Sequence, residues 1–406
     1  MRERLADMRH VPDRERRARL ARRHALAPGH RAAGPEAATR AVAVLHSTEP
    51  ASVYLSIRAR VDGVEIADID RALYEDRSLV KQLAMRRTLF VFPRDLLPAA
   101  WGSASARVAD QLAARLAKEV EAAGHAADGA AWLAEARAGV LAALGDGRAL
   151  TAQEIRQAVP ALEARLDLAP GKKYAANVSI APRVLTQLGV EGLLVRGENA
   201  GHWRISKPRW TLMSDWLGDV PPRAKADEGY AELVGRWLGS FGPGTEDDIV
   251  WWLGSTKGAV RAALAALGAV EVSLDGGGTG WVLPDDPLLD GGPEEEVDPW
   301  AALLPVLDPT VMGWKQRGWY LGEHAPHLFD TNGNAGTTAW WDGRIVGCWV
   351  QDDAGVVEVR LLEKLPRAAK AAFRAEAERL TDWLAGVKVG TVYPSAAMKV
   401  VDWVHP

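Results

Sequence analysis

The sequence predicts an α+β protein in which tandem winged-helix domains precede a separate β-rich α+β unit. Two segments, 146–222 and 223–290, each show a capped helix, a second helix and a two-stranded hairpin in that order. From residue 291 to 406 the pattern changes to short alternating segments that are typical of strands, followed by one long helix. A chain of 406 residues also exceeds what one hydrophobic core usually spans, so several domains are expected.

The segment 146–222 begins with a capping box. Thr151 can accept a hydrogen bond from the backbone of Glu154, whose side chain can reach back three residues. This helix is expected to end near Pro160, and a second helix to follow Ser179. A hairpin completes the predicted winged helix, with strand 193–195, turn 196–201 and return strand 202–205.

The segment 223–290 repeats the pattern with clearer boundaries. Thr245 starts a helix with an acidic residue, Asp248, at its third position, and Gly254 ends that helix. Ser255 or Thr256 caps the next helix. The predicted hairpin consists of strand 270–274, a glycine-rich loop at 275–280 and a return strand at 281–283.

The N-terminal part, residues 1–145, is predicted to be mainly helical. Residues 14–25 alternate arginine with leucine and alanine as an amphipathic helix does. A further winged helix is predicted here, with helices at 66–74 and 77–85 and a strand at 88–92. Residues 1–40 hold eleven arginines against five acidic residues, but they lack the apolar core of a secretory signal.

The C-terminal unit, residues 291–406, follows an acidic run that favours a solvated linker. The run comprises Asp285, Asp286, Asp290, Glu294, Glu295, Glu296 and Asp298. Strands are predicted at 303–309, 336–341, 344–350 and 356–360, then a helix at 366–384 and a last strand at 387–392. Trp340, Trp341 and Trp349 could stack on bases, but their alternation along strands favours core packing.

Composition narrows the chemistry. A single cysteine, Cys348, excludes an internal disulfide and a cysteine-based zinc site, and it fits a reducing cytoplasm. The sequence contains no motif for phosphate, dinucleotide or zinc-hydrolase sites and no long apolar run, so we expect no cofactor, no metal and no membrane span. His324 and His327, near Glu323 and Asp330, are better explained as surface polar residues than as metal ligands.

The motif Leu45-His46-Ser47-Thr48-Glu49-Pro50 carries a family resemblance. Together with segments 54–60, 70–79, 86–89, 304–309 and 342–349, in that order, it resembles the AlkZ-like (YcaQ-like) DNA glycosylases. The resemblance implies a C-shaped protein in which tandem winged helices and a C-terminal β-barrel surround a DNA channel. It also implies a catalytic pair, His46 and Thr48, separated by Ser47. Most members have Gln at the first position and Gln or Asp at the second.

The resemblance implies hydrolysis of the N-glycosidic bond of an alkylated base, which passes through a transition state like an oxocarbenium ion. A neutral His46 could orient a water and accept its proton, and Thr48 could hold that water or a ribose oxygen. Glu49 is the one carboxylate of the motif and could stabilise the cation. The alternative for His46 is an ordinary loop histidine. The motif contains no lysine, which argues against a Schiff-base lyase.

The expected partner is double-stranded DNA with an alkylated base, bound by a monomer in the cytoplasm near the nucleoid. Basic residues near the motif and the two winged helices are the candidate phosphate contacts. They are Arg86, Arg87, Lys172, Lys173, Arg183, Arg196, Arg204, Lys207, Arg209, Lys257 and Arg261. A non-catalytic winged-helix DNA-binding protein or regulator is the alternative. Regulators usually need dimer symmetry, however, and tandem modules that differ from one another fit that requirement poorly.

Overall fold

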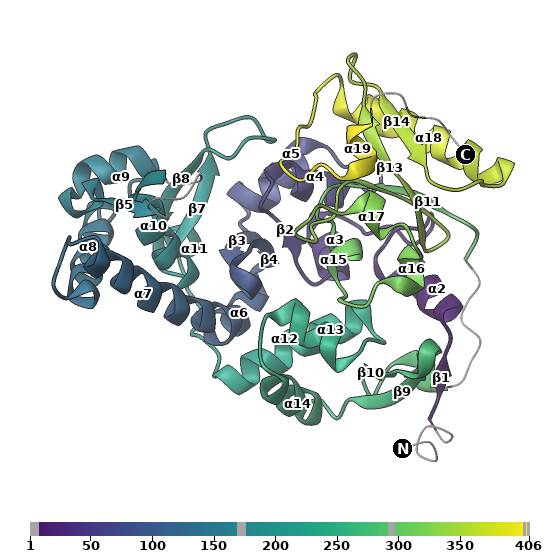
Figure 1. Ribbon diagram of the computed structural model, residues 1–406, viewed down its shortest axis with the longest axis horizontal. Coiled ribbons are helices and arrows are strands. Elements are labelled where there is room, and N and C mark those ends of the chain that lie inside the picture. Colours follow the sequence, from purple (N-terminus) through teal and green to yellow (C-terminus); the bar gives the residue numbers. More distant parts are fainter. Residues whose placement is uncertain (1–7, 169–175, 291–296, 401–402, 404–406) are drawn as a thin grey trace. The chain divides into compact units, whose positions relative to one another are not determined.

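The computed structural model describes residues 8–168, 176–290, 297–400 and 403. The chain forms two compact units (Figure 1). One consists of Arg71–Tyr230, and the other joins the segment up to Asp70 with the segment from Ala231 onward. The four domain boundaries drawn from the sequence remain predictions. None of the described helices combines the length and apolar character needed to cross a membrane.

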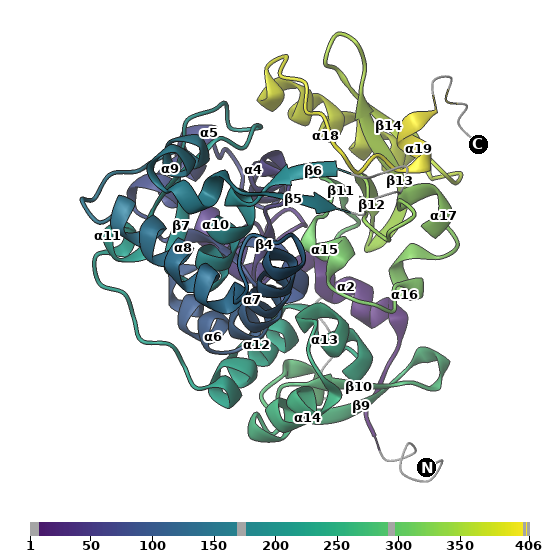
Figure 2. The ribbon, with the colours of Figure 1, turned by 60° about the vertical axis from the view of Figure 1, so that its left-hand side comes forward.

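The Arg71–Tyr230 unit is mixed α+β. In chain order its main elements are η1 (Arg71–Glu75, a π-helix), β3 (Leu79–Leu83), β4 (Leu89–Pro93), α6 (Leu97–Gly102), α7 (Ala104–Ala122), α8 (Gly129–Ala143), α9 (Ala152–Ala158), β5 (Arg165–Leu168), β6 (Ala176–Ser179), α10 (Ala181–Val190), β7 (Leu194–Asn199), β8 (Pro208–Leu212) and α11 (Met213–Leu217). Helices α7, α8 and α10 pack together around a core that includes Leu116, Val140 and Leu188 (Figure 2). This packing buries the apolar stripe of each helix.

The segment 146–222 has the predicted order of elements. The capping box of Thr151 and Glu154 is present, α10 follows Ser179, and β7 pairs with β8 in an antiparallel hairpin. The return strand was misplaced, because it is Pro208–Leu212 and not 202–205. Side-chain bonds of Asn199 hold the intervening residues as a loop, with its Oδ1 accepting from Lys207 N at 2.8 Å. The hairpin β5–β6 was not predicted.

The predicted helix 77–85 is wrong, because this segment forms strand β3, which pairs with β4 in register from Leu79 opposite Pro93 to Leu83 opposite Leu89. Arg77 before the strand has a φ of 53°, and Arg86 after it has a φ of 54°. Left-handed residues at these positions interrupt any helix. The buried Gln82 anchors the strand, since its amide donates to Gly189 O and Val190 O at 3.1 and 3.2 Å.

The second unit contains the N-terminal segment, the second helix–helix–hairpin segment and the C-terminal sheet. Its main elements are β1 (His10–Val11), α2 (Asp13–Arg23), α3 (Pro35–Ala41), β2 (Leu45–His46), α4 (Pro50–Arg58), α5 (Ile66–Asp70), α13 (Glu246–Leu253), α14 (Lys257–Ala266), β9 (Val270–Leu274), β10 (Thr279–Val282), β11 (Ala301–Leu304), α15 (Pro309–Met312), α16 (Gly318–Leu321), α17 (Ala325–Leu328), β12 (Thr338–Trp341), β13 (Arg344–Gln351), β14 (Val357–Leu361), α18 (Arg367–Leu384) and α19 (Ala396–Lys399). Helix α12 (Ala226–Phe241) carries the chain into this unit.

The segment 223–290 also follows its predicted order. Thr245 and Asp248 form the capping box of α13, Gly254 is left-handed at its end, and Thr256 caps α14. Strands β9 and β10 pair antiparallel. A third strand joins them that sequence reasoning did not find, because His10 and Val11 of β1 pair in parallel with β9, more than 260 residues away.

The C-terminal strands form one open sheet with the order β11-β12-β13-β14. Helix α18 packs against both edge strands, β11 and β14 (Figure 1). The expected closed barrel is therefore wrong for the described residues, since a helix lies at the position where strands would have to meet. The predicted strand 387–392 is also absent, and Gln351 instead accepts a hydrogen bond from Val389 N in this stretch. Trp340 and Trp349 are buried in the core, as predicted.

The acidic run before this sheet is only partly a solvated linker. Asp286 is 5% exposed and accepts from Arg19 and Arg23 at 2.6 and 2.8 Å. Burial raises the pKa of this carboxyl, but the two arginines outweigh burial and bring the pKa below its usual value. The arginine-rich α2 is thus tied to the end of the 223–290 segment, and residues 291–296 lie outside the described residues.

Candidate active site and nucleic-acid interface

The predicted catalytic motif lies between a short strand and a helix. His46 ends β2, and Glu49 is the residue before the first turn of α4. His46, Ser47 and Glu49 are buried, with exposed fractions of 7%, 3% and 9%. Thr48 is exposed. The structure therefore brings the four residues onto one tight turn but presents them differently, with Thr48 alone of the four accessible to solvent.

Glu49 is held on one side only. Its Oε1 accepts from Thr391 Oγ1 at 2.8 Å and from the Val392 backbone N–H at 2.6 Å. Its Oε2 is buried and has no hydrogen-bond partner among the described residues. Burial raises the pKa of this carboxyl, and the two hydrogen bonds oppose that effect without cancelling it. The motif's carboxylate is thus a buried acid with one acceptor oxygen unused.

A buried polar network fixes α4, the helix that follows the motif. Ser52 Oγ donates to Val306 O at 2.9 Å, and Ser56 Oγ donates to Asp308 at 2.7 Å. Arg60 forms a two-pronged ion pair with the same carboxylate at 2.8 and 2.9 Å, with both side chains fully buried. This network ties the motif's helix to the start of the C-terminal sheet and limits movement of the turn that carries His46–Glu49.

The pKa of Asp308 reflects that network. Burial alone would raise it, but the adjacent Arg60 guanidinium and the hydrogen bonds from Ser56 and the Thr310 backbone together hold the pKa below its usual value. Asp308 is therefore a carboxylate at neutral pH, and its charge is matched inside the core.

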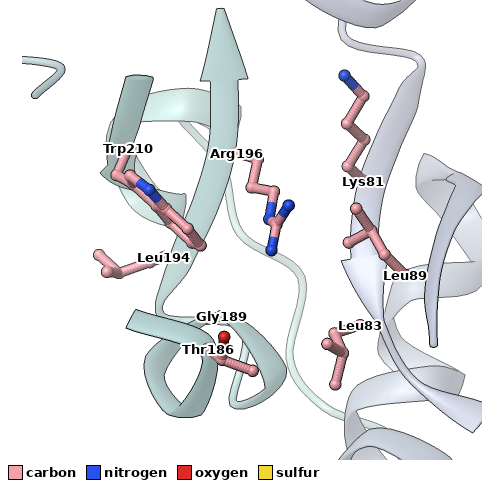
Figure 3. A pocket seen from close by; sticks show the side chains of 8 residues that line it. All are labelled: Lys81, Leu83, Leu89, Thr186, Gly189, Leu194, Arg196 and Trp210. Atoms are coloured by element: carbon pink, nitrogen blue, oxygen red, sulfur yellow. The ribbon is translucent and has the colours of Figure 1, made fainter. Parts of the chain in front are cut away.

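A cavity of about 290 Å³ lies next to Glu49. Its wall comes from α4, from β13 and from the stretch 388–398, all within the same unit. A second cavity, in the Arg71–Tyr230 unit, has a volume of about 10 Å³ and is lined by Lys81, Leu83 and Arg196 among others (Figure 3). A space of that size holds at most about one water molecule, so it offers no binding site.

The predicted DNA contacts fall into distinct groups. Arg204 and Lys207 lie exposed on the loop between β7 and β8, and neither forms an ion pair within the described part of the chain. Arg87 is exposed in the turn between β3 and β4, next to the partly buried Arg86. Lys172 and Lys173 lie outside the described residues.

Other candidates already have partners. Arg183 pairs with Glu119, and Arg209 lies 3.8 Å from Glu154. Arg196 is stacked 5.2 Å from the Trp210 ring centre, and burial lowers the pKa of its guanidinium (Figure 3).

The two candidates on α14 are also paired. Lys257 lies 2.9 Å from Asp247, and Arg261 lies 2.6 Å from Glu246. Their charge is locally balanced, so they attract phosphate less than an unpaired cation would. His324 also has a partner, since its Nε2 lies at hydrogen-bond distance, 3.0 Å, from Glu363 Oε2.

Sequence reasoning missed the partners of the motif. Thr391 lies 342 residues from Glu49, and Asp308 lies 248 residues from Arg60. No local pattern marks such pairs, because a side-chain contact across the fold leaves no spacing signal. The only sign in the sequence that Arg60 and Asp308 are buried is the apolar character of the residues next to each of them.

Comparison with known proteins identifies the family. The model of the AlkZ-like DNA glycosylases matches residues 39–383, which include the motif and most of both units. The chain belongs to the AlkZ-like DNA glycosylase family. Among solved structures it is similar to the DNA glycosylase AlkZ of Streptomyces sahachiroi, with a TM-score of 0.71 and 20% identity over 91% of this chain and 96% of that chain. No curated protein matches.

Membership identifies the protein as a DNA glycosylase, a hydrolase of N-glycosyl bonds that acts in the repair of alkylated bases, with DNA as its partner. The non-catalytic alternative is not favoured.

Proposed function

We propose that the protein is a monomeric, monofunctional glycosylase that hydrolyses the N-glycosidic bond of an alkylated base in double-stranded DNA. The observation that carries the proposal is the family match over residues 39–383, which spans His46, Ser47 and Thr48. An alkylated, cationic base is a good leaving group, so the protein needs mainly to position a water and to stabilise a developing cation.

In the proposed mechanism the main task of His46 is to orient the attacking water, whose proton it can also accept, while Thr48 holds the water from the solvent side. This division of roles is supported by their burial, since His46 is mostly enclosed and Thr48 is exposed on the same turn. Ser47 between them is buried and serves as a spacer. Glu49 supplies negative potential near the developing cation. No lysine lies in the motif, so water rather than an amine is the nucleophile.

We further propose that the segments 146–222 and 223–290 act as winged helices on the DNA. The order of helix, helix and hairpin in each supports this assignment. The loop between β7 and β8 is the wing of the first, and its exposed Arg204 and Lys207 are the best-placed phosphate contacts. Such contacts position the protein without reading sequence, which suits an enzyme that must find lesions in any context.

The test is release of free base from methylated duplex DNA, measured by chromatography, alongside retention of the same DNA. Wild-type protein is expected to release N-alkylated purine, and His46→Ala is expected to abolish release while DNA retention and the unfolding transition stay unchanged. Retention of damaged DNA without release from any alkylated substrate would leave only the binding-protein alternative.

A further inference from the structure

A strap formed by residues 387–395, in neither a helix nor a strand, lies against the motif turn. One end is fixed by Gln351, whose side-chain oxygen accepts from Val389 N at 2.9 Å and whose amide donates to Val387 O at 3.0 Å. The other end is fixed by the buried Ser395, which leads into α19. The strap is therefore anchored on both sides of the point where it contacts the motif.

Polar contact, and not apolar burial, holds the centre of the strap. The side chain of Val392 is 77% exposed, so it contributes little hydrophobic stabilisation. The backbone N–H of the same residue donates to Glu49 Oε1 at 2.6 Å, and Thr391 Oγ1 donates to that oxygen at 2.8 Å. Hydrogen bonds to a carboxylate are stronger than those between neutral groups. The motif's acid and the strap therefore fix each other's position.

The hydroxyl of Thr391 is itself oriented. A threonine hydroxyl has one proton to donate and two lone pairs that accept. The Tyr393 backbone N–H donates to Thr391 Oγ1 at 2.9 Å, while the hydroxyl proton is directed to Glu49. Since Glu49 Oε2 has no hydrogen-bond partner among the described residues, the orientation of this carboxyl depends on the two contacts to Oε1.

We propose that Thr391 is a positioning residue for base release, because its hydroxyl holds the Glu49 carboxylate in the orientation that stabilises the developing cation. The inference rests on the proposed function for the role of Glu49, and on the contacts of the strap for the role of Thr391. A group held by such supporting contacts loses no time or energy to reorientation during the reaction. Thr391 lies beyond residues 39–383, which the family model matches, so the assignment concerns a part of the chain outside that match.

The test begins with Thr391→Val, which removes the hydroxyl with little change in side-chain size, and Thr391→Ser, which keeps it. The matched control is Thr381→Val in the same unit, where the lost hydroxyl oxygen accepts from Val357 N at 2.9 Å and no contact with the motif is involved. Single-turnover release from methylated duplex DNA measures the rate, and fluorescence anisotropy measures binding of the same duplex.

Thr391→Val should lower the rate of base release by about tenfold, the lower end of the effect of losing one positioned polar group, because the Val392 N–H still holds Glu49. Thr391→Ser and Thr381→Val should release base at the rate of the wild type. Duplex binding should be unchanged in all three variants. Melting curves check that each variant folds, and Thr391→Ala takes the place of the valine variant if that variant does not.

A double-mutant cycle with Glu49→Gln separates positioning from a general structural effect. The glutamine oxygen can still accept from Thr391, but the negative charge is gone. If Thr391 acts through that charge, Thr391→Val causes no further loss of rate in the Glu49→Gln background.

An equal loss of rate in both backgrounds would overturn the proposal, as would a wild-type rate for Thr391→Val or a serine variant as slow as the valine variant. In each of these cases base release by the wild type leaves the proposed function standing. A wild type that releases no base would instead refute the proposed function, and the role of Thr391 with it.

Discussion

The loop between β7 and β8 offers the most direct quantitative test, through the double change Arg204→Ala, Lys207→Ala. Both side chains are exposed and neither forms an ion pair in the described part of the chain, so each can neutralise a phosphate at no cost to another contact. Each phosphate contact contributes about 0.9 to the steepness with which the logarithm of the DNA-binding constant falls with the logarithm of the salt concentration. The loss of two contacts should therefore flatten this slope by about 1.8. Between about 50 and 200 mM salt, the two contacts together account for roughly a twelvefold change in affinity.

The matched control is Lys257→Ala, Arg261→Ala, which also removes two exposed cations. These two lie 2.9 and 2.6 Å from Asp247 and Glu246, so their charge is already balanced, and their loss should change the slope by less. Fluorescence anisotropy of a labelled duplex over a salt series, with each protein shown to unfold like wild type, measures both. An unchanged slope for the loop variant, or an equal change in both variants, would refute the assignment of this wing to the DNA surface.

Three further predictions concern the motif and its support. His46→Gln restores the usual family residue and should retain or raise base release in single-turnover assays. Loss of release in this variant would show that proton transfer outweighs orientation. Thr48→Ala should lower the rate of base release by about tenfold to a thousandfold in the same assays. Glu49→Gln should raise thermal stability at neutral pH, because burial disfavours the charged form of this carboxyl and raises its pKa in the folded state. In the wild type, the stabilisation by the protonated form is present below the ordinary pKa of 4.5 and is lost as pH rises through the folded value. The gap between variant and wild type should therefore widen from acidic to neutral pH in melting curves, and a gap independent of pH contradicts this. Asp308→Ala leaves the buried Arg60 without its partner and should cost about 3–5 kcal/mol in urea unfolding; a cost below about 1 kcal/mol, the scale of a surface pair, would mean that the pair contributes little.

The sequence by itself determined the elements whose signals are local. The capping boxes at Thr151 and Thr245, the left-handed Gly254 and the long helix α18 were all predictable, because a cap or a helix period involves residues only a few positions apart. Family membership was likewise legible in the order of short motifs from residue 45 onward, and the match over residues 39–383 confirms it.

Tertiary structure decided what depends on distant partners. Residues 79–83 are apolar enough for either a helix or a strand, and pairing with β4 made them a strand. The C-terminal sheet stayed open because α18 lies against both of its edges, and alternation within strands does not say whether a sheet closes.

The candidate site shows the same division. The motif His46–Glu49 was found from its resemblance to the family motif, but the burial of three of its four residues, the contact of Glu49 with Thr391 and the cavity beside it were not predicted. The physical reason is that burial and charge pairing are set by segments hundreds of residues apart, while sequence patterns report only on neighbours. Folding also decides which candidate cations remain available to DNA, because an acidic partner such as Glu246 can be identified only from the tertiary structure.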